Sequence, residues 1–299
     1  MGRGAASGAP ECPAGAGDFG RHAWPTLGLA CGMLALHVAA VALAARGAWA
    51  LGGLVGAAAA WTAFTCLHEA SHGTVSRARA LNALVGELGA HVLGVRFLGF
   101  RQLHQRHHRH TNDVTLDPDA YVGRGPRALR PLRLATTDLH YYVAYDRRAL
   151  RASRSEAWLS NASVAALLGL GVAVAYTLGP AALVFGWLVP ARVALFAAAY
   201  VADALPHGRP SAPSREQSPL GHTRAVEGGR AFDWLALGQA QHLLHHLWPR
   251  VPFYRLPALW RRERGQLVAR GVDVVDPLGR PLRVVPSVEG PGLAVCATR

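Results

Sequence analysis

The chain contains 299 residues, of which 51% are hydrophobic and 16% are charged, and its formal net charge at pH 7 is +13. A basic chain can bind nucleic acid, but no zinc-finger spacing, RNA-binding sheet motif or helix-turn-helix signal accompanies this charge, so no nucleic-acid partner is expected. The cysteines are scattered without pair spacing, which argues against a disulfide framework and an iron–sulfur cluster; they are Cys12, Cys31, Cys66 and Cys296.

The apolar residues fall into blocks long enough to cross a bilayer. Residues 1–23 precede these blocks and are rich in Gly, Ala and Pro without a signal-peptide core, so we expect a disordered tail. Residues 83–100 are apolar but interrupted by Glu87, His91 and Arg96, which favours a helix at the membrane interface. The other blocks predict an all-α integral membrane protein with four transmembrane helices, at about residues 25–45, 50–67, 158–178 and 181–204.

One charged residue interrupts the fourth predicted span. Arg192 follows Pro190, which suggests a kink, and a charge at the bilayer centre costs roughly 2.5 to 3.5 kcal/mol on insertion scales. Either Arg192 faces the protein interior, or the span begins later and Arg192 reaches an interface. The sequence leaves both alternatives open.

Arginine supplies all 31 basic residues, and its distribution predicts an orientation. Fourteen arginines lie from Arg77 to Arg154 and thirteen from Arg209 to Arg299, whereas the short connections between paired spans carry only Arg46. Because cytoplasmic segments are enriched in basic residues, we expect a multi-pass protein with both termini and the central loop in the cytoplasm.

Eight histidines form three clusters with helical spacing. The clusters read H-E-A-S-H, H-Q-R-H-H and H-L-L-H-H, and positions i, i+3 and i+4 share one face of a helix. Neutral imidazole is a common ligand of transition metals, and eight imidazoles exceed what one ion coordinates. The pattern therefore predicts a two-metal site on the cytoplasmic side, with the ligands His68, His72, His104, His107, His108, His242, His245 and His246.

These clusters resemble the three histidine boxes of the membrane fatty acid desaturase and hydroxylase superfamily. Their context is also similar: H-H-R-H-T-N-D at 107–113, D-P-D at 117–119 and H-H-L-W-P-R-V-P-F-Y-R-L-P at 245–257. The resemblance covers about residues 24–262, and it implies a cytoplasmic helical cap that holds a di-iron site. The segment D-A-L-P-H-G at 203–208 resembles the extra histidine of many members, which makes His207 a ninth candidate ligand.

Four carboxylates are candidates to hydrogen-bond the ligand imidazoles and fix their tautomers. Asp113, Asp117 and Asp119 surround Pro118, where they would otherwise cap turns, and Asp203 precedes His207 by four residues, where a helix cap is the alternative. The other histidines near or between the clusters are interpreted as ordinary surface or hydrogen-bonded residues; they are His22, His37, His91, His140 and His222.

Two other functional classes deserve comparison. His68-Glu69-Ala70-Ser71-His72 satisfies the H-E-x-x-H signature of zinc proteases, in which Glu activates water, but such an enzyme has no use for two further histidine clusters. A histidine-rich metal transporter would place its ligands within the spans, whereas these clusters lie at helix ends or in polar segments. Both classes are remote alternatives.

The resemblance implies a membrane-bound lipid desaturase or hydroxylase acting on a long-chain acyl substrate, with carotenoid ring hydroxylation or ketolation as the alternative. Unactivated C–H bonds are not reached by acid–base catalysis, so two iron ions with dioxygen as co-substrate are expected. No H-P-G-G cytochrome b5 segment, G-x-G-x-x-G fingerprint or ferredoxin cysteine pattern is present, so we expect electrons from a separate donor of ferredoxin or cytochrome b5 type.

The substrate is expected to enter from the bilayer into an apolar channel, for which the candidate lining residues are Phe97, Phe100, Trp234 and Phe253. Residues 263–299 are expected to form an extension without a catalytic motif. This extension contains two short β-like pieces, 272–275 and 282–285, and should pack on the cap or remain mobile.

Overall fold

Four long apolar helices dominate the computed structural model, which describes residues 10–149, 153–208 and 212–283. Each is long and apolar enough to cross a bilayer, so the prediction of four spans is confirmed. The second helix continues past the predicted end of its span and therefore carries the first histidine cluster in its last turns. The four helices are α1 (Trp24–Ala45), α2 (Trp49–His72), α8 (Arg154–Leu178) and a helical run from Pro180 to His207.

The fourth span is assembled from five helical segments. In chain order these are α9 (Pro180–Leu183), η2 (Val184–Leu188), α10 (Val189–Ala198), η3 (Ala199–Ala204) and α11 (Leu205–His207). Both η2 and η3 are π-helical turns. Pro190 has no backbone N–H to donate, and the π turn that ends just before α10 accommodates the missing hydrogen bond without ending the helix.

A sharply bent pair of helices follows the second span. α3 (Arg79–Leu93) and α4 (Phe97–His110) meet at an angle of 101°. α3 ends at Gly94, whose φ of 71° lies in the left-handed region that glycine adopts without a Cβ clash. The prediction of a single helix over residues 83–100 is therefore wrong, because the break falls inside that range and the second half begins the helix that carries the second histidine cluster, while the interfacial location stays a prediction.

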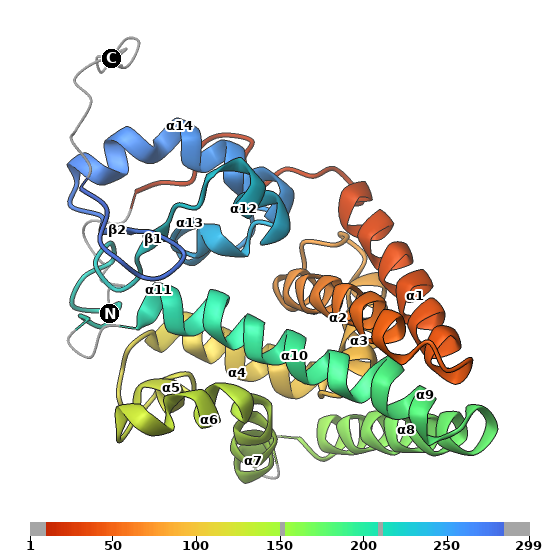
Figure 1. The fold of residues 1–299 in the computed structure, drawn as a ribbon. Coiled ribbons are helices and arrows are strands. Elements are labelled where there is room, and N and C mark those ends of the chain that lie inside the picture. Colours follow the sequence, from red (N-terminus) through yellow and green to blue (C-terminus); the bar gives the residue numbers. More distant parts are fainter. Residues whose placement is uncertain (1–9, 150–152, 209–211, 284–299) are drawn as a thin grey trace.

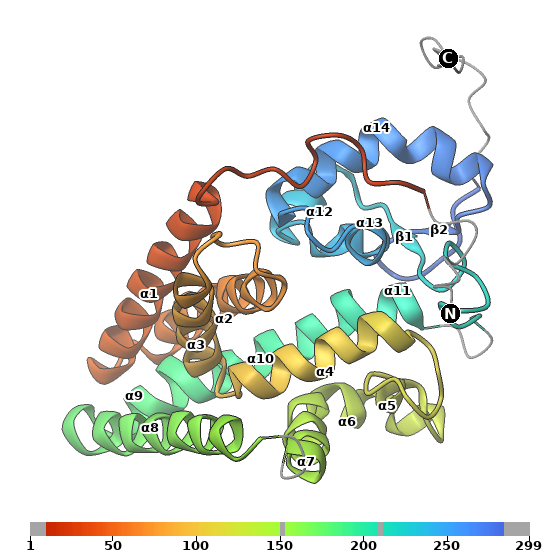
Figure 2. The same cartoon turned by 180° about the vertical axis from the view of Figure 1, so that it is seen from behind.

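The remaining elements form a cap at the histidine-bearing end of the spans. In Figure 1, α12 to α14 lie above α10 and α5 to α7 lie below it, and the view from behind keeps this order (Figure 2). Two short strands pair in parallel, Ala225 with Val274. The elements of the cap are α5 (Ala120–Gly123), η1 (Arg127–Leu129), α6 (Arg130–Ala135), α7 (Thr137–Ala149), β1 (Ala225–Val226), α12 (Gly229–Leu235), η4 (Gln239–Gln241), α13 (His242–Leu247), η5 (Phe253–Arg255), α14 (Leu256–Ala269) and β2 (Val274–Val275).

The segment 10–23 lies against the cap. The indole N–H of Trp248 donates to the carbonyl of Pro10 at 3.1 Å, and the guanidinium of Arg255 donates to the carbonyl of Gly15 at 2.8 Å. The described part of the tail that the sequence predicts to be disordered therefore has defined contacts. The first nine residues of that prediction lie outside the described part of the chain.

The C-terminal region continues the cap without a break at the predicted boundary between residues 262 and 263, because α14 runs across it. The β-like piece predicted at 272–275 contains β2, which pairs with β1. The second predicted piece, 282–285, extends beyond the described residues. The backbone N–H of Leu282 donates to the carbonyl of Val274 at 2.9 Å, so the start of that piece lies beside β2.

Arg192 is paired with a carboxylate of the cap. Its guanidinium donates to both oxygens of Asp138 on α7, at 2.9 and 2.7 Å. The Asp138 side chain is only 5% exposed, and a two-pronged ion pair of this kind compensates the desolvation of a charge. The Arg192 side chain is itself 43% exposed, so the ion pair anchors α7 to the fourth span, and the depth of Arg192 in the bilayer stays a prediction.

Close packing of the spans depends on two glycines. A Cβ at Gly56 of α2 would lie 2.7 Å from the ring of Pro190, and a Cβ at Gly186 of η2 would lie 2.7 Å from the Cα of Val41 in α1. Within a bilayer, small residues allow backbones to approach closely enough for van der Waals contact to hold helices together. These glycines therefore set the separation between α1, α2 and the fourth span.

Gly56→Ala should lower the melting temperature of the detergent-purified protein, because overpacking typically costs about 1–3 kcal/mol. Gly169→Ala on α8 is the matched control. Nothing lies within 4 Å of its Cβ position, and alanine is the better helix former by about 1 kcal/mol, so its melting temperature should stay the same or rise. A Gly56→Ala protein as stable as the control would contradict the packing described here.

Candidate metal centre

Nine histidines from four helices converge where the spans meet the cap. They form two groups, and within each group one ring nitrogen of every member lies within 4.8 Å of the others. All nine histidines that the sequence proposes as ligands belong to one of these groups. The first group contains His68, His72, His104, His108 and His245, and the second contains His107, His207, His242 and His246.

Helical geometry explains how two helices serve both groups. Residues four apart lie nearly above one another on a helix, whereas neighbouring residues are turned by about 100°. On α4, His104 and His108 face the first group and His107 is turned toward the second. On α13 the order is reversed, because the i, i+4 pair His242 and His246 belongs to the second group. The H-x-x-H-H pattern thus serves two centres rather than one.

In the first group the Nε2 atoms of several imidazoles lie close to one another. His104 Nε2 lies 2.8 Å from His72 Nε2 and 3.1 Å from His108 Nε2, which lies 2.9 Å from His245 Nε2. Both ring nitrogens of His68 are buried without a hydrogen-bond partner among the described residues. A neutral imidazole has one donor and one acceptor, so nitrogens that converge on one point leave lone pairs unpaired. A transition-metal ion fits this donor set.

The second group has the same character. His246 Nε2 lies 3.2 Å from His107 Nε2 and 3.0 Å from His242 Nε2. His207 Nε2 is buried and has no hydrogen-bond partner in the described part of the chain, while its Nδ1 lies 3.3 Å from the carbonyl of His222. Because a carbonyl only accepts, Nδ1 of His207 carries the proton and Nε2 has a free lone pair. His222, which the sequence analysis interprets as ordinary, thus orients a candidate ligand through its backbone.

Burial keeps most of these imidazoles neutral. It lowers the pKa of His104, His108, His242, His245 and His246 well below the usual value, and the neighbouring imidazoles lower it further. A neutral imidazole offers the lone pair that metal coordination requires. The centre is therefore ready to bind cations without first releasing protons from these five rings.

His107 differs because two carboxylates lie beside it. Burial lowers its pKa, but Asp117 and Asp119 together raise the pKa to about 10. His107 Nδ1 lies 2.9 Å from Asp117 Oδ1 and 3.3 Å from Asp119 Oδ2. Since an ionised carboxylate can only accept, Nδ1 donates to it, while Nε2 faces the second group and at this pKa also carries a proton, which a metal ion would have to displace. Carboxylates that orient a histidine ligand in this way are common at metal sites.

Asp113 does not join these carboxylates. Its Oδ1 accepts the backbone N–H groups of Thr115 and Leu116, both at 2.8 Å, and these bonds, led by that of Leu116, lower the pKa of the Asp113 carboxyl. No contact with a candidate ligand is present among the described residues. The turn-capping alternative therefore holds for Asp113, and its proposed contact with a ligand imidazole is not observed.

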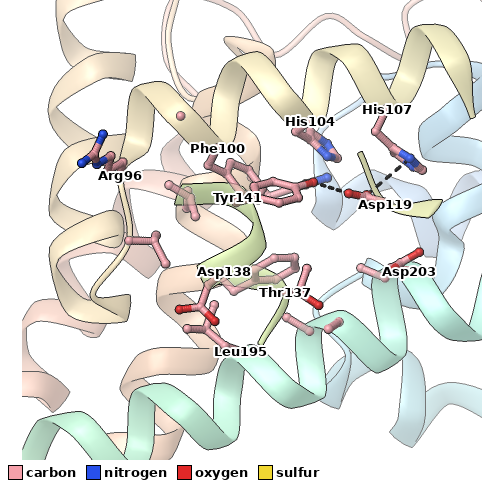
Figure 3. A pocket seen from close by; sticks show the side chains of 18 of the residues that line it. Arg96, Phe100, His104, His107, Asp119, Thr137, Asp138, Tyr141, Leu195 and Asp203 are labelled. Atoms are coloured by element: carbon pink, nitrogen blue, oxygen red, sulfur yellow. Dashed lines mark hydrogen bonds and ion pairs between the residues drawn. The ribbon is translucent and has the colours of Figure 1, made fainter. Parts of the chain in front are cut away.

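Asp203 lies on the π turn η3, and its Oδ2 is buried without a hydrogen-bond partner in the described residues. Figure 3 shows Asp203 across the cavity from Asp119 and His107. The Tyr141 hydroxyl donates a short hydrogen bond to Asp119, so a chain of contacts leads from Tyr141 through Asp119 to His107. Both aspartates are candidates from the sequence pattern, whereas no pattern points to Tyr141.

Two other supporting side chains are also missed. The Thr111 hydroxyl donates to the carbonyl of His107 at 2.8 Å and lies 3.3 Å from His246 Nδ1. Arg215 donates to the carbonyls of His108 and His246, at 2.9 and 3.3 Å. These contacts join α4 to α13 and to the loop between α11 and β1. Except for the bond of Thr111, the residue after α4, to His107, these contacts join residues that are 31 to 135 positions apart, so no local sequence signal could have found them.

An apolar cavity reaches the metal centre. Its volume is about 90 Å³, and all the space within its lining, including the open mouth, is about 860 Å³. Figure 3 shows Arg96 and His107 at opposite ends of its lining. Its walls come from α2, α4, α7 and the fourth span, and include Phe64, Leu67, Phe100, Tyr141, Leu195 and Ala198; histidines of both groups close one end, namely His68, His104, His107 and His242.

Of the four residues that the sequence predicts to line the substrate channel, only one lines this cavity. Phe100 lines the cavity as predicted. Phe97 instead packs in the core between α3 and α4, and Phe253 is buried elsewhere in the cap. Trp234 is 76% exposed on α12. Amino-acid type alone therefore identified one of four lining positions, because apolar side chains serve packing more often than binding.

The fold and this site define a helical membrane protein with a histidine-rich candidate metal centre, and comparison with known proteins gives its family. A sequence model of the fatty acid desaturase family matches residues 23–276, so the chain belongs to this family. A chloroplastic omega-3 fatty acid desaturase from Glycine max is 25% identical over 230 residues, which cover 66% of this chain. The chain spans about half the length of that relative.

Protein purified after growth with added iron should contain about two metal atoms per chain, because two groups of imidazoles are available. His245→Ala should lower this content, since it removes a member of the first group. His91→Ala is the control, because His91 Nδ1 bonds the carbonyl of Glu87 away from the centre. Elemental analysis checks the ratio, and a single zinc atom that is unaffected by His245→Ala would contradict a two-metal centre.

Proposed function

We propose that this protein is a membrane-bound, oxygen-dependent desaturase or hydroxylase that uses two iron ions to oxidise long-chain acyl lipids. The observation that carries the proposal is the contact between the histidine groups and the apolar cavity: His68, His104 and His107 belong to the groups and also line the cavity. Family membership and the omega-3 fatty acid desaturase of Glycine max support the same chemistry.

Bound iron would supply the power to reduce dioxygen and break an unactivated C–H bond, which side-chain acids and bases do not provide. The residues of this chain have the other tasks. Phe64, Phe100 and Leu195 provide an apolar surface that holds a hydrocarbon chain and excludes water from it. Asp117 keeps the proton on His107 Nδ1 and so directs Nε2 toward the second group.

The zinc protease alternative loses support at Glu69. In that mechanism the glutamate of H-E-x-x-H activates a water on the metal. Here the buried Glu69 carboxylate accepts from the Thr74 hydroxyl at 2.8 Å and from the backbone N–H of Phe253 at 3.3 Å. These bonds join the end of α2 to the cap. Glu69 therefore has a structural role, and it belongs to neither histidine group.

We also propose that both termini and the metal centre lie on the cytoplasmic side, because the arginine-rich segments flank the histidine-bearing ends of the spans. Cys12 is exposed and offers a test. In a variant that keeps Cys12 as its only cysteine, a membrane-impermeant maleimide should label inside-out vesicles but not intact cells. Labelling of intact cells would reverse the orientation.

The product tests the proposed function. Purified protein with iron, dioxygen and a chemical reductant should convert acyl lipids by loss of two hydrogens or gain of one oxygen, as mass spectrometry of the lipids would show. The conversion should stop under nitrogen. If acyl lipids remain unchanged while an added carotenoid gains a hydroxyl or keto oxygen, the substrate proposed here is wrong.

Glu69→Gln separates the oxidative mechanism from proteolysis in the same assay. The amide still accepts through its oxygen, so lipid oxidation should fall by less than about tenfold, whereas a protease would lose its general base. Cleavage of a membrane peptide without oxygen, abolished by Glu69→Gln, would overturn the oxidative function.

A further inference from the structure

A polar cleft reaches the metal centre at His72. Of the eight box histidines, His72 alone is partly exposed, while the other seven are at most 8% exposed. The cleft lies between the segment 10–23, the end of α2, the start of α3 and one face of α4. Its lining includes Gly17, Phe19, His72, Arg77, Arg79, Asn82, Arg101, Gln105 and Arg250.

The charge of the cleft has one sign. Its lining contains four arginines and no aspartate or glutamate. Arg77 is held by Asp18 at 3.2 Å and by the carbonyl of Gly20 at 2.8 Å, both in the N-terminal segment. The other three, Arg79, Arg101 and Arg250, are exposed and have no ion pair with a carboxylate among the described residues. Their field is therefore uncompensated and attracts negative charge.

A second polar opening reaches the centre at His207 but differs in charge. Its lining combines arginines, including Arg127, with the carboxylates of Asp117, Asp119 and Asp203. Positive charge at that rim is thus opposed by negative charge at its floor. The cleft at His72 is the better match for an acidic surface, since complementary rather than mixed charge speeds the encounter of two proteins.

His72 also connects the cleft to the first histidine group. Its Nε2 lies 2.8 Å from His104 Nε2, and His104 Nε2 lies 3.1 Å from His108 Nε2. An electron that arrives at the exposed edge of His72 is therefore already at a candidate ligand. The apolar cavity, in contrast, is lined by His68, His104, His107 and His242 and not by His72. Substrate and reductant can thus approach the centre from different sides.

We propose that the cleft lined by Arg79, Arg101 and Arg250 docks a small acidic one-electron carrier protein, which reduces the metal centre through His72. This rests on the proposed oxidative function, which needs a reductant. Removal of two hydrogens from the lipid supplies two electrons, and reduction of dioxygen to two waters consumes four. The carrier therefore gives up two electrons, one at a time, and two protons come from water.

The test uses the full chain loaded with iron in detergent, a plant-type ferredoxin and the soluble domain of cytochrome b5 as acidic probes, and reduced methyl viologen as a small reductant. The triple variant Arg79→Glu, Arg101→Glu, Arg250→Glu should weaken binding of the acidic carrier by about tenfold or more and remove most of its salt dependence. Lipid oxidation driven by methyl viologen should stay within about twofold of wild type.

A matched control has the same change in net charge on other exposed arginines. The control is the triple variant Arg127→Glu, Arg230→Glu, Arg261→Glu. These three arginines lie outside the cleft, and Arg127 lines the second opening. This variant should bind the carrier within about threefold of wild type. The comparison separates docking at the cleft from a general effect of positive charge.

Several results would overturn the docking proposal. These are equal loss of binding in both variants, loss only in the control, or failure of both acidic carriers to bind wild type. If wild type oxidises no lipid even with methyl viologen, the proposed function fails instead. Carrier binding still reports on the cleft in that case, because it is measured without turnover.

Discussion

The structure depends on nine imidazoles, eight of them buried, whose nitrogens converge on two points. An unsatisfied buried polar group costs roughly 1–3 kcal/mol, and several of these nitrogens have no hydrogen-bond partner among the described residues. Such an arrangement is favourable only when cations take the lone pairs. A metal bound at these histidines would therefore couple to folding of the cap, since the candidate ligands come from four helices that are distant in sequence.

The spans and the cap together bring the candidate ligands to one place. α2 and the fourth span both continue past their apolar parts, so each ends on a candidate ligand, His72 or His207. The π turn η3 places Asp203 beside the cavity just before His207. The ion pair between Arg192 and Asp138 fixes α7 against the span. The apolar lining of the cavity therefore lies directly beside the histidine groups, and both are positioned by helices.

Two openings of different character lead to the histidine groups. The apolar cavity approaches from the side of the spans, whereas a purely cationic cleft approaches at His72. The segment 10–23 is part of this division, since Gly17 and Phe19 form a wall of the cleft and Asp18 holds Arg77. The composition of this segment predicts disorder, yet the segment forms part of the cleft. Its backbone carbonyls accept hydrogen bonds from the cap, and such bonds do not depend on the side chains of the segment.

The sequence by itself determined the candidate spans and the candidate ligands, because apolar length and i, i+3, i+4 spacing are local properties that the bilayer and the helix impose. It did not determine the bend at Gly94, the division of α4 and α13 between two groups, or the roles of Tyr141 and Arg215. Those depend on which distant segments meet. Asp117 and Asp113 illustrate the difference, since both flank the same turn, and only the tertiary structure brings Asp117 to His107 and leaves Asp113 to cap the turn.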